Sequence, residues 1–118
     1  VLFLGDRGDV AALYQAMDVL VLPSLFEGLP MVGVEAQCAG LPMVCSDRVP
    51  DEVAIGDCEF LPLEAPLSQW ATRVAQAIDQ GRDLGRRGQG TTLTRTAGFD
   101  ITLEADRLAH RYWDLAGR

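Results

Sequence analysis

The stretch DVLVLPSLFEGLPMVGVEAQCAGLPMVCSD, residues 18–47, decides the fold class of this chain. It opens with the apolar run DVLVL at 18–22 and closes with PMVCS at 42–46, and each run is bounded by turn residues. Short continuous apolar runs are typical of strands that are buried on both faces. The residues between them are enough for one helix. Strand, helix and strand with short links predict parallel strands joined by a crossover.

Outward from this stretch, the pattern predicts further elements that would complete an α/β fold. Strands are expected at VLFLG (1–5) and EFLPL (59–63), one helical turn at 50–54, and helices at 9–17, 30–39, 67–78 and 101–115. Helix ends are indicated by capping residues. Asp9 and Asp100 are suited to N-caps, Pro30 to a first helical position and Gly40 to the position after a helix. The glycine-rich segment at 81–90 gives no clear prediction.

Composition limits the class of protein. A chain of 118 residues with 48% hydrophobic content is about the size of one globular domain. Its 17 acidic residues outnumber 10 basic ones, giving a net charge of −7, which argues against a nucleic-acid partner because phosphate contacts need a basic face.

The three cysteines, Cys38, Cys45 and Cys58, are odd in number and lack paired C-x-x-C spacing, so neither a disulfide framework nor a zinc site is predicted. We interpret Cys38 and Cys45 as core residues and Cys58 as a loop thiol, and a reducing cytosol as the natural compartment. Because the chain opens directly in the apolar run VLFLG, we interpret it as a piece of a longer protein.

The loop at residues 23–29 is the first candidate site. In open parallel sheets, ligands bind beyond the carboxyl ends of the strands, where loops lead into helix N-termini. A helix N-terminus offers free N–H groups and partial positive charge, which suit a phosphate. Gly28 would allow a close approach of the backbone to such a ligand. Pro30 has no N–H, so the donors would be Leu29, Met31 and Val32.

Two glutamates flank this helix start. The neighbours of Glu35 at three and four residues' distance are Met31, Val32, Cys38 and Ala39, which predicts a carboxylate on a buried face, where a charge needs a partner. That partner would be a buried Arg or backbone N–H, or the hydroxyl groups of a ligand. Glu27 lies in the turn, where it would be a solvated carboxylate, a cap of the next helix or a functional group.

A family resemblance bears on both glutamates. The sequence resembles retaining GT-B glycosyltransferases of the family 4 type, group 1. The matching residues read AMDVLVLPSLFEGLPMVGVEAQCAGLPMVCSD, together with the upstream FLG and the D-x-x-x-L-Y of residues 9–14. The likeness is detailed over residues 2–62. Its most specific element is Glu27, seven residues and then Glu35 within a strand, turn and helix. It implies a Rossmann-like parallel sheet flanked by helices, with residues 1–118 forming part of the C-terminal, nucleotide-sugar-binding domain.

The resemblance also implies a role for each residue. Glu27 would contact the donor sugar and serve catalysis, Glu35 would bind the ribose, and Gly28 with the N–H groups of Leu29, Met31 and Val32 would hold the diphosphate. The loop from Gly5 to Asp9, including Gly5 and Arg7, would approach the base. Many relatives have Phe-Gly in place of Leu29-Pro30, which changes the number of phosphate donors.

The implied function is transfer of a sugar, with retention, from a UDP- or GDP-linked donor to a glycan or lipid-linked acceptor in bacterial polysaccharide synthesis. The missing N-terminal domain would bind the acceptor, so this piece alone would be inactive. Fixed N–H dipoles can stabilise a leaving diphosphate without a metal. The sequence contains no D-x-D, so neither a metal nor a separate cofactor is expected. The expected location is the cytoplasm, with any attachment to the inner face of the plasma membrane made through the missing part.

Two alternatives stay open: a catalytically inactive nucleotide-binding or regulatory module, and a GT-B epimerase or phosphorylase. The intact Glu27 and Glu35 pair favours the transferase. Several other residues are interpreted as structural. The single histidine, His110, is expected to be exposed or to pack on a helix, Asp47 to be solvated, and the aromatic residues Trp70, Tyr112 and Trp113 to pack in the core or between domains.

Overall fold

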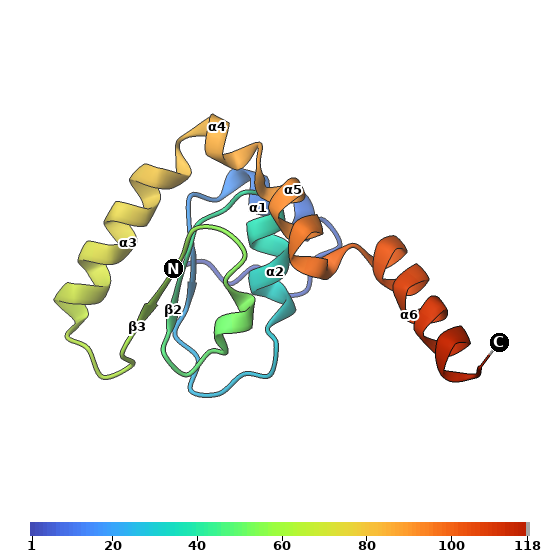
Figure 1. Ribbon diagram of the computed structural model, residues 1–118. Helices are drawn as coiled ribbons and strands as arrows, with labels where there is room; N and C mark the ends of the chain where they lie inside the picture. The colour runs from blue at the N-terminus through green and yellow to red at the C-terminus, as the bar shows by residue number, and fades with distance from the viewer. Residues whose placement is uncertain (118) are drawn as a thin grey trace.

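The computed structural model describes residues 1–117 and has an α/β fold built on a three-stranded parallel sheet in the order β1-β2-β3 (Figure 1). The strands are β1 (Leu20–Leu22), β2 (Met43–Ser46) and β3 (Cys58–Leu61). All three were predicted from their apolar runs. In the register, Met43 of β2 pairs with Leu20 on one side and Cys58 on the other. Strand β2 is therefore the central strand.

Helices precede, connect and follow these strands. They are α1 (Val10–Ala16), α2 (Met31–Cys38), the short 3₁₀ helix η1 (Asp51–Val53), α3 (Leu67–Gly81), α4 (Leu84–Arg87), α5 (Gly90–Thr94), the π-helical turn η2 (Arg95–Phe99) and α6 (Ile101–Leu115). The expected helix at 101–115 has the predicted bounds, and Asp100 caps it by accepting hydrogen bonds from Thr102 and Leu103. The glycine-rich segment contains α4 and leads into α5.

The sheet lies between α3 on one face and α2 on the other (Figure 1). All four residues of β2 are buried, and their side chains alternate between the two faces. Met43 and Cys45 join a core cluster with Val34 of α2. Val44 packs on the other face with Trp70 of α3. Burial on both faces explains why β2 reads as a continuous apolar run rather than an alternating one.

The C-terminus of α2 is fixed by its cap. Gly40 has a left-handed φ of 73°, as expected for the residue after a helix. The N–H of Gly40 donates to Gln37 O and that of Leu41 to Ala36 O, which together form a Schellman motif. A side chain at Gly40 would collide with the backbone of Arg87, because an added Cβ would lie 2.3 Å from its carbonyl oxygen. The cap therefore also allows α4 to pack against the end of α2.

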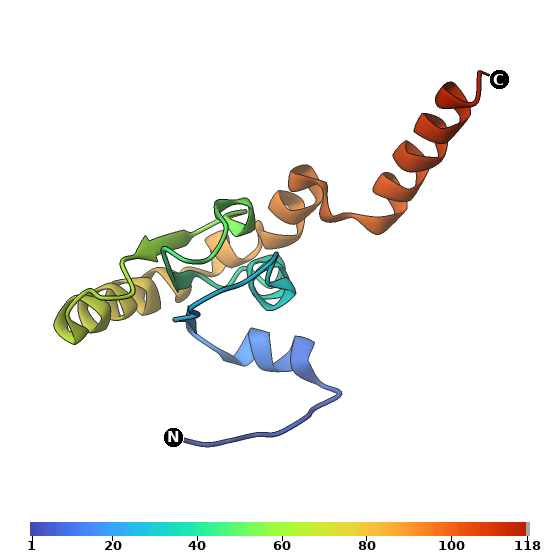
Figure 2. The same ribbon diagram turned by 90° about the horizontal axis from the view of Figure 1, so that it is seen from below.

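The prediction of a buried strand at residues 1–5 was wrong. These residues form no strand and are exposed; the side chain of Phe3, for example, is 96% exposed. Figure 2 shows the segment running apart from the sheet. An apolar run becomes a strand only where a neighbouring strand accepts its backbone hydrogen bonds, and none lies beside residues 1–5 in the described part of the chain.

Smaller corrections concern caps and single residues. Asp9 lies at the N-cap position of α1 but makes no capping hydrogen bond, because its carboxylate pairs with Arg7. Pro30 is the N-cap residue of α2 rather than its first helical residue. Cys58 lies in β3 rather than in a loop, with its thiol 3.7 Å from that of Cys45. Leu67, the first residue of α3, is exposed.

Helix α6 projects from the rest of the fold (Figures 1 and 2). It has no buried residue, and Tyr112 and Trp113, expected to pack, are 66% and 58% exposed. Trp70 does pack in the core, as expected. Within the described residues, none of the helices is both long and apolar enough to cross a membrane.

Candidate functional site

The candidate site begins at the carboxyl end of β1, where residues 23–30 connect the strand to α2. The neighbouring strand anchors this loop. Ser46, the fully buried last residue of β2, donates its hydroxyl to the carbonyl oxygen of Ser24 at 2.5 Å. The hydrogen bond ties the start of the loop to the central strand and thereby fixes its exit from the sheet.

The same serine positions Glu27. The Ser24 hydroxyl donates to Glu27 Oε1 at 2.7 Å, and both residues are half-buried. A hydrogen bond to a carboxylate is stronger than one between neutral groups, so Ser24 restricts the rotamers of Glu27. One carboxylate oxygen, Oε2, has no hydrogen-bond partner within residues 1–117. Glu27 is thus a held carboxylate rather than a freely solvated one, and it can still accept further hydrogen bonds.

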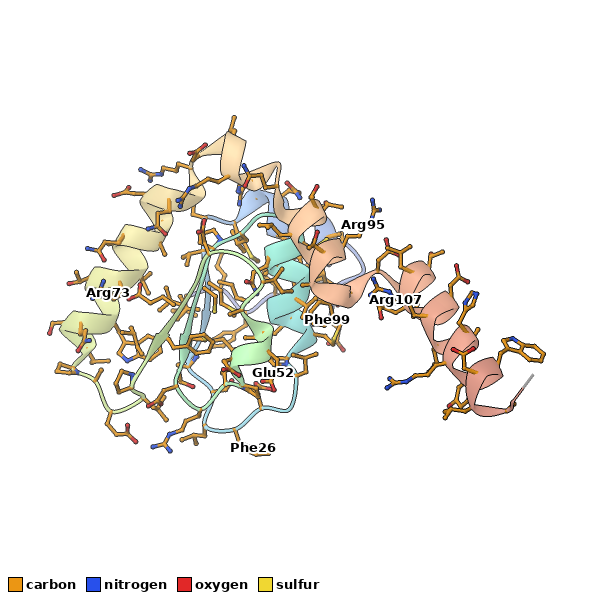
Figure 3. All side chains as sticks on the ribbon, in the orientation of Figure 1. Phe26, Glu52, Arg73, Arg95, Phe99 and Arg107 are labelled. Carbon is orange, nitrogen blue, oxygen red and sulfur yellow. The ribbon has the colours of Figure 1, made fainter. Side chains whose placement is uncertain are left out.

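The N-terminus of α2 presents backbone donors beside Glu27. In the described part of the chain, the N–H groups of Leu29, Met31 and Val32 donate to no protein acceptor, and all three residues are exposed. Gly28 lies in open space beside them, because an added Cβ there would meet nothing within 4 Å. Phe26 points outward from the same loop (Figure 3). This helix end can bind an anion through its free N–H groups and partial positive charge.

Glu35 corrects a sequence-based expectation. It lies on an exposed face of α2 with Met31 and Val32, whereas the buried face is formed by Gly33, Val34, Ala36 and Gln37. The prediction of a buried face was wrong, because Met31 and Val32 are apolar but exposed, and Cys38 and Ala39 are only half-buried. Its partner is neither an Arg nor a backbone N–H: the Tyr14 hydroxyl of α1 donates to Glu35 Oε2 at 3.2 Å.

Tyr14 itself is well fixed. Its side chain is 6% exposed and packs with Ala36 and Leu41. Burial, together with the carboxylate of Glu35, raises the pKa of Tyr14 above its ordinary value. The hydroxyl therefore keeps its proton at neutral pH and acts as a donor to Glu35. A pocket of about 360 Å³ lies against this pair, with Thr91 of α5 on its wall.

The loop that precedes α1 is less organised around the site. Gly5 has a left-handed φ of 63° with open space around it. Arg7 forms a two-pronged ion pair with Asp9, in which Nε and Nη2 lie 2.7 and 2.6 Å from the carboxylate oxygens. Within residues 1–117, no hydrogen bond or ion pair connects Gly5 or Arg7 to Glu27 or Glu35. Glu27, Gly28 and the α2 donors thus lie next to one another along the loop and the helix start, whereas Gly5 and Arg7 have no hydrogen bond or ion pair that ties them to this arrangement within the described residues.

Other titratable groups lie outside this arrangement. His110 is exposed on α6, where Nδ1 is 2.8 Å from Asp106 O. Asp47, expected to be solvated, is exposed, but it also accepts from the Leu63 N–H and pairs with Arg48. No group of three or more His, Cys, Asp or Glu side chains that could hold a metal ion is found among residues 1–117.

Sequence reasoning missed three residues that shape the site: Ser24, Tyr14 and Gln37. Ser24 lies only three residues before Glu27, so their contact is local in the sequence. Tyr14 is the last residue of the D-x-x-x-L-Y match at 9–14, but nothing in that match indicates its contact with Glu35, which lies 21 positions away. Gln37 is 3% exposed and binds Val53 O, Ile55 N and Gly56 N. It connects α2 to the segment after η1, another long-range contact.

Comparison with known proteins now identifies the family. A family model described as "Glycosyl transferases group 1" matches residues 1–80, which include α1, the sheet, α2 and most of α3. The chain belongs to this glycosyltransferase family. Its α/β architecture is consistent with the Rossmann-like C-terminal domain of a GT-B fold. The matched segment contains Glu27, Glu35 and the N-terminus of α2, whereas α4 to α6 lie beyond it.

Curated relatives agree with this family. A putative glycosyltransferase, EpsF, of Bacillus subtilis strain 168 is 45% identical over 84 residues, which are 70% of this chain and 22% of that protein. An α-1,3-galactosyltransferase of Escherichia coli that acts on UDP-Gal and α-D-GlcNAc-diphosphoundecaprenol is 50% identical over 46 residues, 39% of this chain and 12% of that protein. The D-inositol 3-phosphate glycosyltransferase of Corynebacterium diphtheriae is 30% identical over 111 residues, which are 92% of this chain and 26% of that protein. The chain thus spans about a quarter or less of the length of these relatives.

Proposed function

We propose that the protein containing this chain transfers a sugar, with retention of anomeric configuration, from a nucleoside-diphosphate sugar to a glycan or lipid-linked acceptor. In this proposal the chain is the donor-binding part, and a further domain supplies the acceptor site. The observation that carries it is the juxtaposition of a held carboxylate, Glu27, with the free N–H groups at the start of α2 and an exposed carboxylate, Glu35, on the same helix.

The spacing along α2 suits a nucleotide. A helix rises 1.5 Å per residue, so Glu35 lies about 6 Å beyond Met31 along the helix axis. A diphosphate at the N–H groups of Met31 and Val32 would place a ribose near Glu35, whose carboxylate can accept from two hydroxyls. At the other end of the diphosphate, Glu27 would accept from hydroxyls of the transferred sugar.

The same groups would assist bond cleavage. As the bond between the anomeric carbon and the diphosphate oxygen breaks, negative charge develops on the leaving diphosphate. The N–H groups of Leu29, Met31 and Val32 are fixed dipoles that would stabilise this charge, and they need no metal to do so. Glu27 would orient the sugar and stabilise positive charge at its anomeric carbon. It is the catalytic residue of this chain in the proposal.

The relatives suggest the substrates. The Escherichia coli protein is named for a UDP-linked galactose and a diphosphoundecaprenol-linked acceptor, and a Campylobacter jejuni relative that is 45% identical over 45 residues is also named for a diphosphoundecaprenol acceptor. We therefore propose a UDP- or GDP-linked hexose donor and a role in bacterial polysaccharide synthesis. The protein would work in the cytoplasm, where it meets a lipid-linked acceptor at the inner face of the plasma membrane.

The test measures binding and turnover separately in the full-length protein. Glu35→Ala should weaken binding of uridine or guanosine diphosphate by at least tenfold in calorimetry, because a hydrogen-bonded charged group is lost. Glu27→Ala should lower turnover at least a hundredfold with little change in nucleotide affinity.

Glu104→Ala, on α6, is the matched control and should change neither quantity. Unchanged nucleotide affinity in the Glu35 variant would exclude the proposed ribose contact. Full turnover in the Glu27 variant would exclude its catalytic role.

A further inference from the structure

Glu35 is an exposed, flexible side chain for a residue proposed to recognise a ribose. A glutamate on a helix surface has three rotatable bonds, and ordering it on binding costs conformational entropy. Selective recognition of two adjacent hydroxyls requires the carboxylate plane to be held before the ligand arrives. A neighbouring residue must supply that restraint.

The hydroxyl of Tyr14 supplies it. Tyr14 Oη lies 3.2 Å from Glu35 Oε2, and it is the protein donor to this carboxylate within the described residues. Oε1 accepts from no protein donor there, and Oε2 retains a further lone pair. One oxygen is thus held while the carboxylate still has capacity for two ligand hydroxyls.

Tyr14 is held rigidly in turn. Its ring is buried against Ala36 and Leu41, so its hydroxyl has little freedom to move. The carbonyl groups at the end of α1 are clamped by the guanidinium of Arg87, which donates to Gln15 O at 2.9 Å and also to Met17 O. A cation at a helix C-terminus is further favoured by the helix dipole.

We infer that Tyr14 is a positioning residue, which orients the Glu35 carboxylate so that the site selects a ribonucleoside diphosphate over its 2′-deoxy counterpart. The inference rests on the proposed function, because it needs Glu35 to contact the ribose. A ligand lacking the 2′-hydroxyl makes only one of the two hydrogen bonds to Glu35. It therefore gains less from a carboxylate held in the right plane.

The test compares two ligands in the full-length protein and in Tyr14→Phe, which removes the hydroxyl and keeps the buried ring. Calorimetric affinities are measured for uridine diphosphate and 2′-deoxyuridine diphosphate, and for the guanosine pair if guanosine diphosphate binds more tightly. We expect Tyr14→Phe to weaken ribonucleotide binding by about tenfold, as for one lost hydrogen bond to a charged group. Deoxynucleotide binding should change by less than about threefold, so the ribose preference falls.

Tyr112→Phe is the matched control, because this tyrosine is 66% exposed on α6; it should leave both affinities unchanged. An equal loss for both ligands in Tyr14→Phe would mean general loosening of α1 and would overturn the inference. The inference would also be overturned if Tyr14→Phe, like Tyr112→Phe, left both affinities unchanged while Glu35→Ala still lost binding. The proposed function would then stand. If Glu35→Ala also binds both ligands normally, the inference and the proposed ribose contact both fail.

Discussion

Helices α2 and α6 were both predicted from the sequence, but the rest of the chain holds them in opposite ways. Four of the eight residues of α2 are buried, and α2 ends in a Schellman motif against α4. Helix α6 has a marked apolar stripe, a side-chain cap and the predicted bounds, yet none of its 15 residues is buried (Figures 1 and 3). Local signals thus specify where a helix begins and ends, whereas burial depends on which distant segments meet it.

The largest expected difference in stability between the two regions comes from replacing the glycine that follows each helix. Gly40, after α2, and Gly117, after α6, have similar left-handed φ values of 73° and 68°. Gly40→Ala should destabilise the fold by about 4 kcal/mol, because left-handed strain of 1–2 kcal/mol adds to overpacking against the Arg87 backbone. Native-state hydrogen exchange at the amides of β2 would measure it as a lower free energy of opening.

Gly117→Ala is the control, because it has the same backbone strain but nothing within 4 Å of the new Cβ. It should cost no more than the backbone strain of about 1–2 kcal/mol, confined to the end of α6. Equal losses in the two variants would show that backbone conformation alone, and not the contact with α4, makes Gly40 necessary.

A smaller difference in stability is expected when one polar side chain of each helix is replaced by leucine. Gln37→Leu removes the acceptor of the Ile55 and Gly56 N–H groups and the donor to Val53 O, and should cost about 2–3 kcal/mol in β2 hydrogen exchange. On α6, His110→Leu removes one exposed hydrogen bond and should change stability by less than about 0.5 kcal/mol. A Gln37 variant as stable as the His110 variant would show that water replaces these bonds.

The difference between local signals and long-range packing also separates the features that the sequence predicted from those that it did not. The apolar runs of β1 to β3 and the cap of α6 are local patterns, and each was predicted correctly. The run at residues 1–5 is equally apolar but lacks a neighbouring strand, and apolar residues beside Glu35 proved to be uncovered. A pattern of residue types gives the propensity of a segment, but not whether another segment covers it.

The candidate site shows the same limit. The spacing of Glu27 and Glu35 and the donors of Met31 and Val32 could be placed from the sequence, because they follow one another along a strand, a turn and a helix. The side chain that holds Glu35 could not, because Tyr14 reaches it through the packing of α1 on α2. Residues that orient a site through long-range contacts leave no spacing that one sequence can reveal.

The smallest expected effect tests whether α6 depends on its local cap alone. Arg95 holds the pKa of Asp100 below its ordinary value of about 3.9, as do the hydrogen bonds from the Leu103 and Thr102 N–H groups. Since the folded pKa is lowered, the stabilisation is present above pH 3.9 and is lost as the pH falls through the folded pKa. The amide chemical shifts of Thr102 and Leu103 should therefore titrate with a midpoint below 3.9.

Asp100→Asn separates the cap from the charge, because asparagine caps a helix about as well but does not titrate. In this variant the two amide shifts should show no transition at acidic pH, while amides of β2 should behave as in the unchanged protein. If β2 amides responded to Asp100 protonation, α6 would be coupled to the sheet in solution despite its exposure. The contrast between a packed α2 and a locally specified α6 would then be wrong, because a helix stabilised only by its own residues can lose its cap without any change in the core.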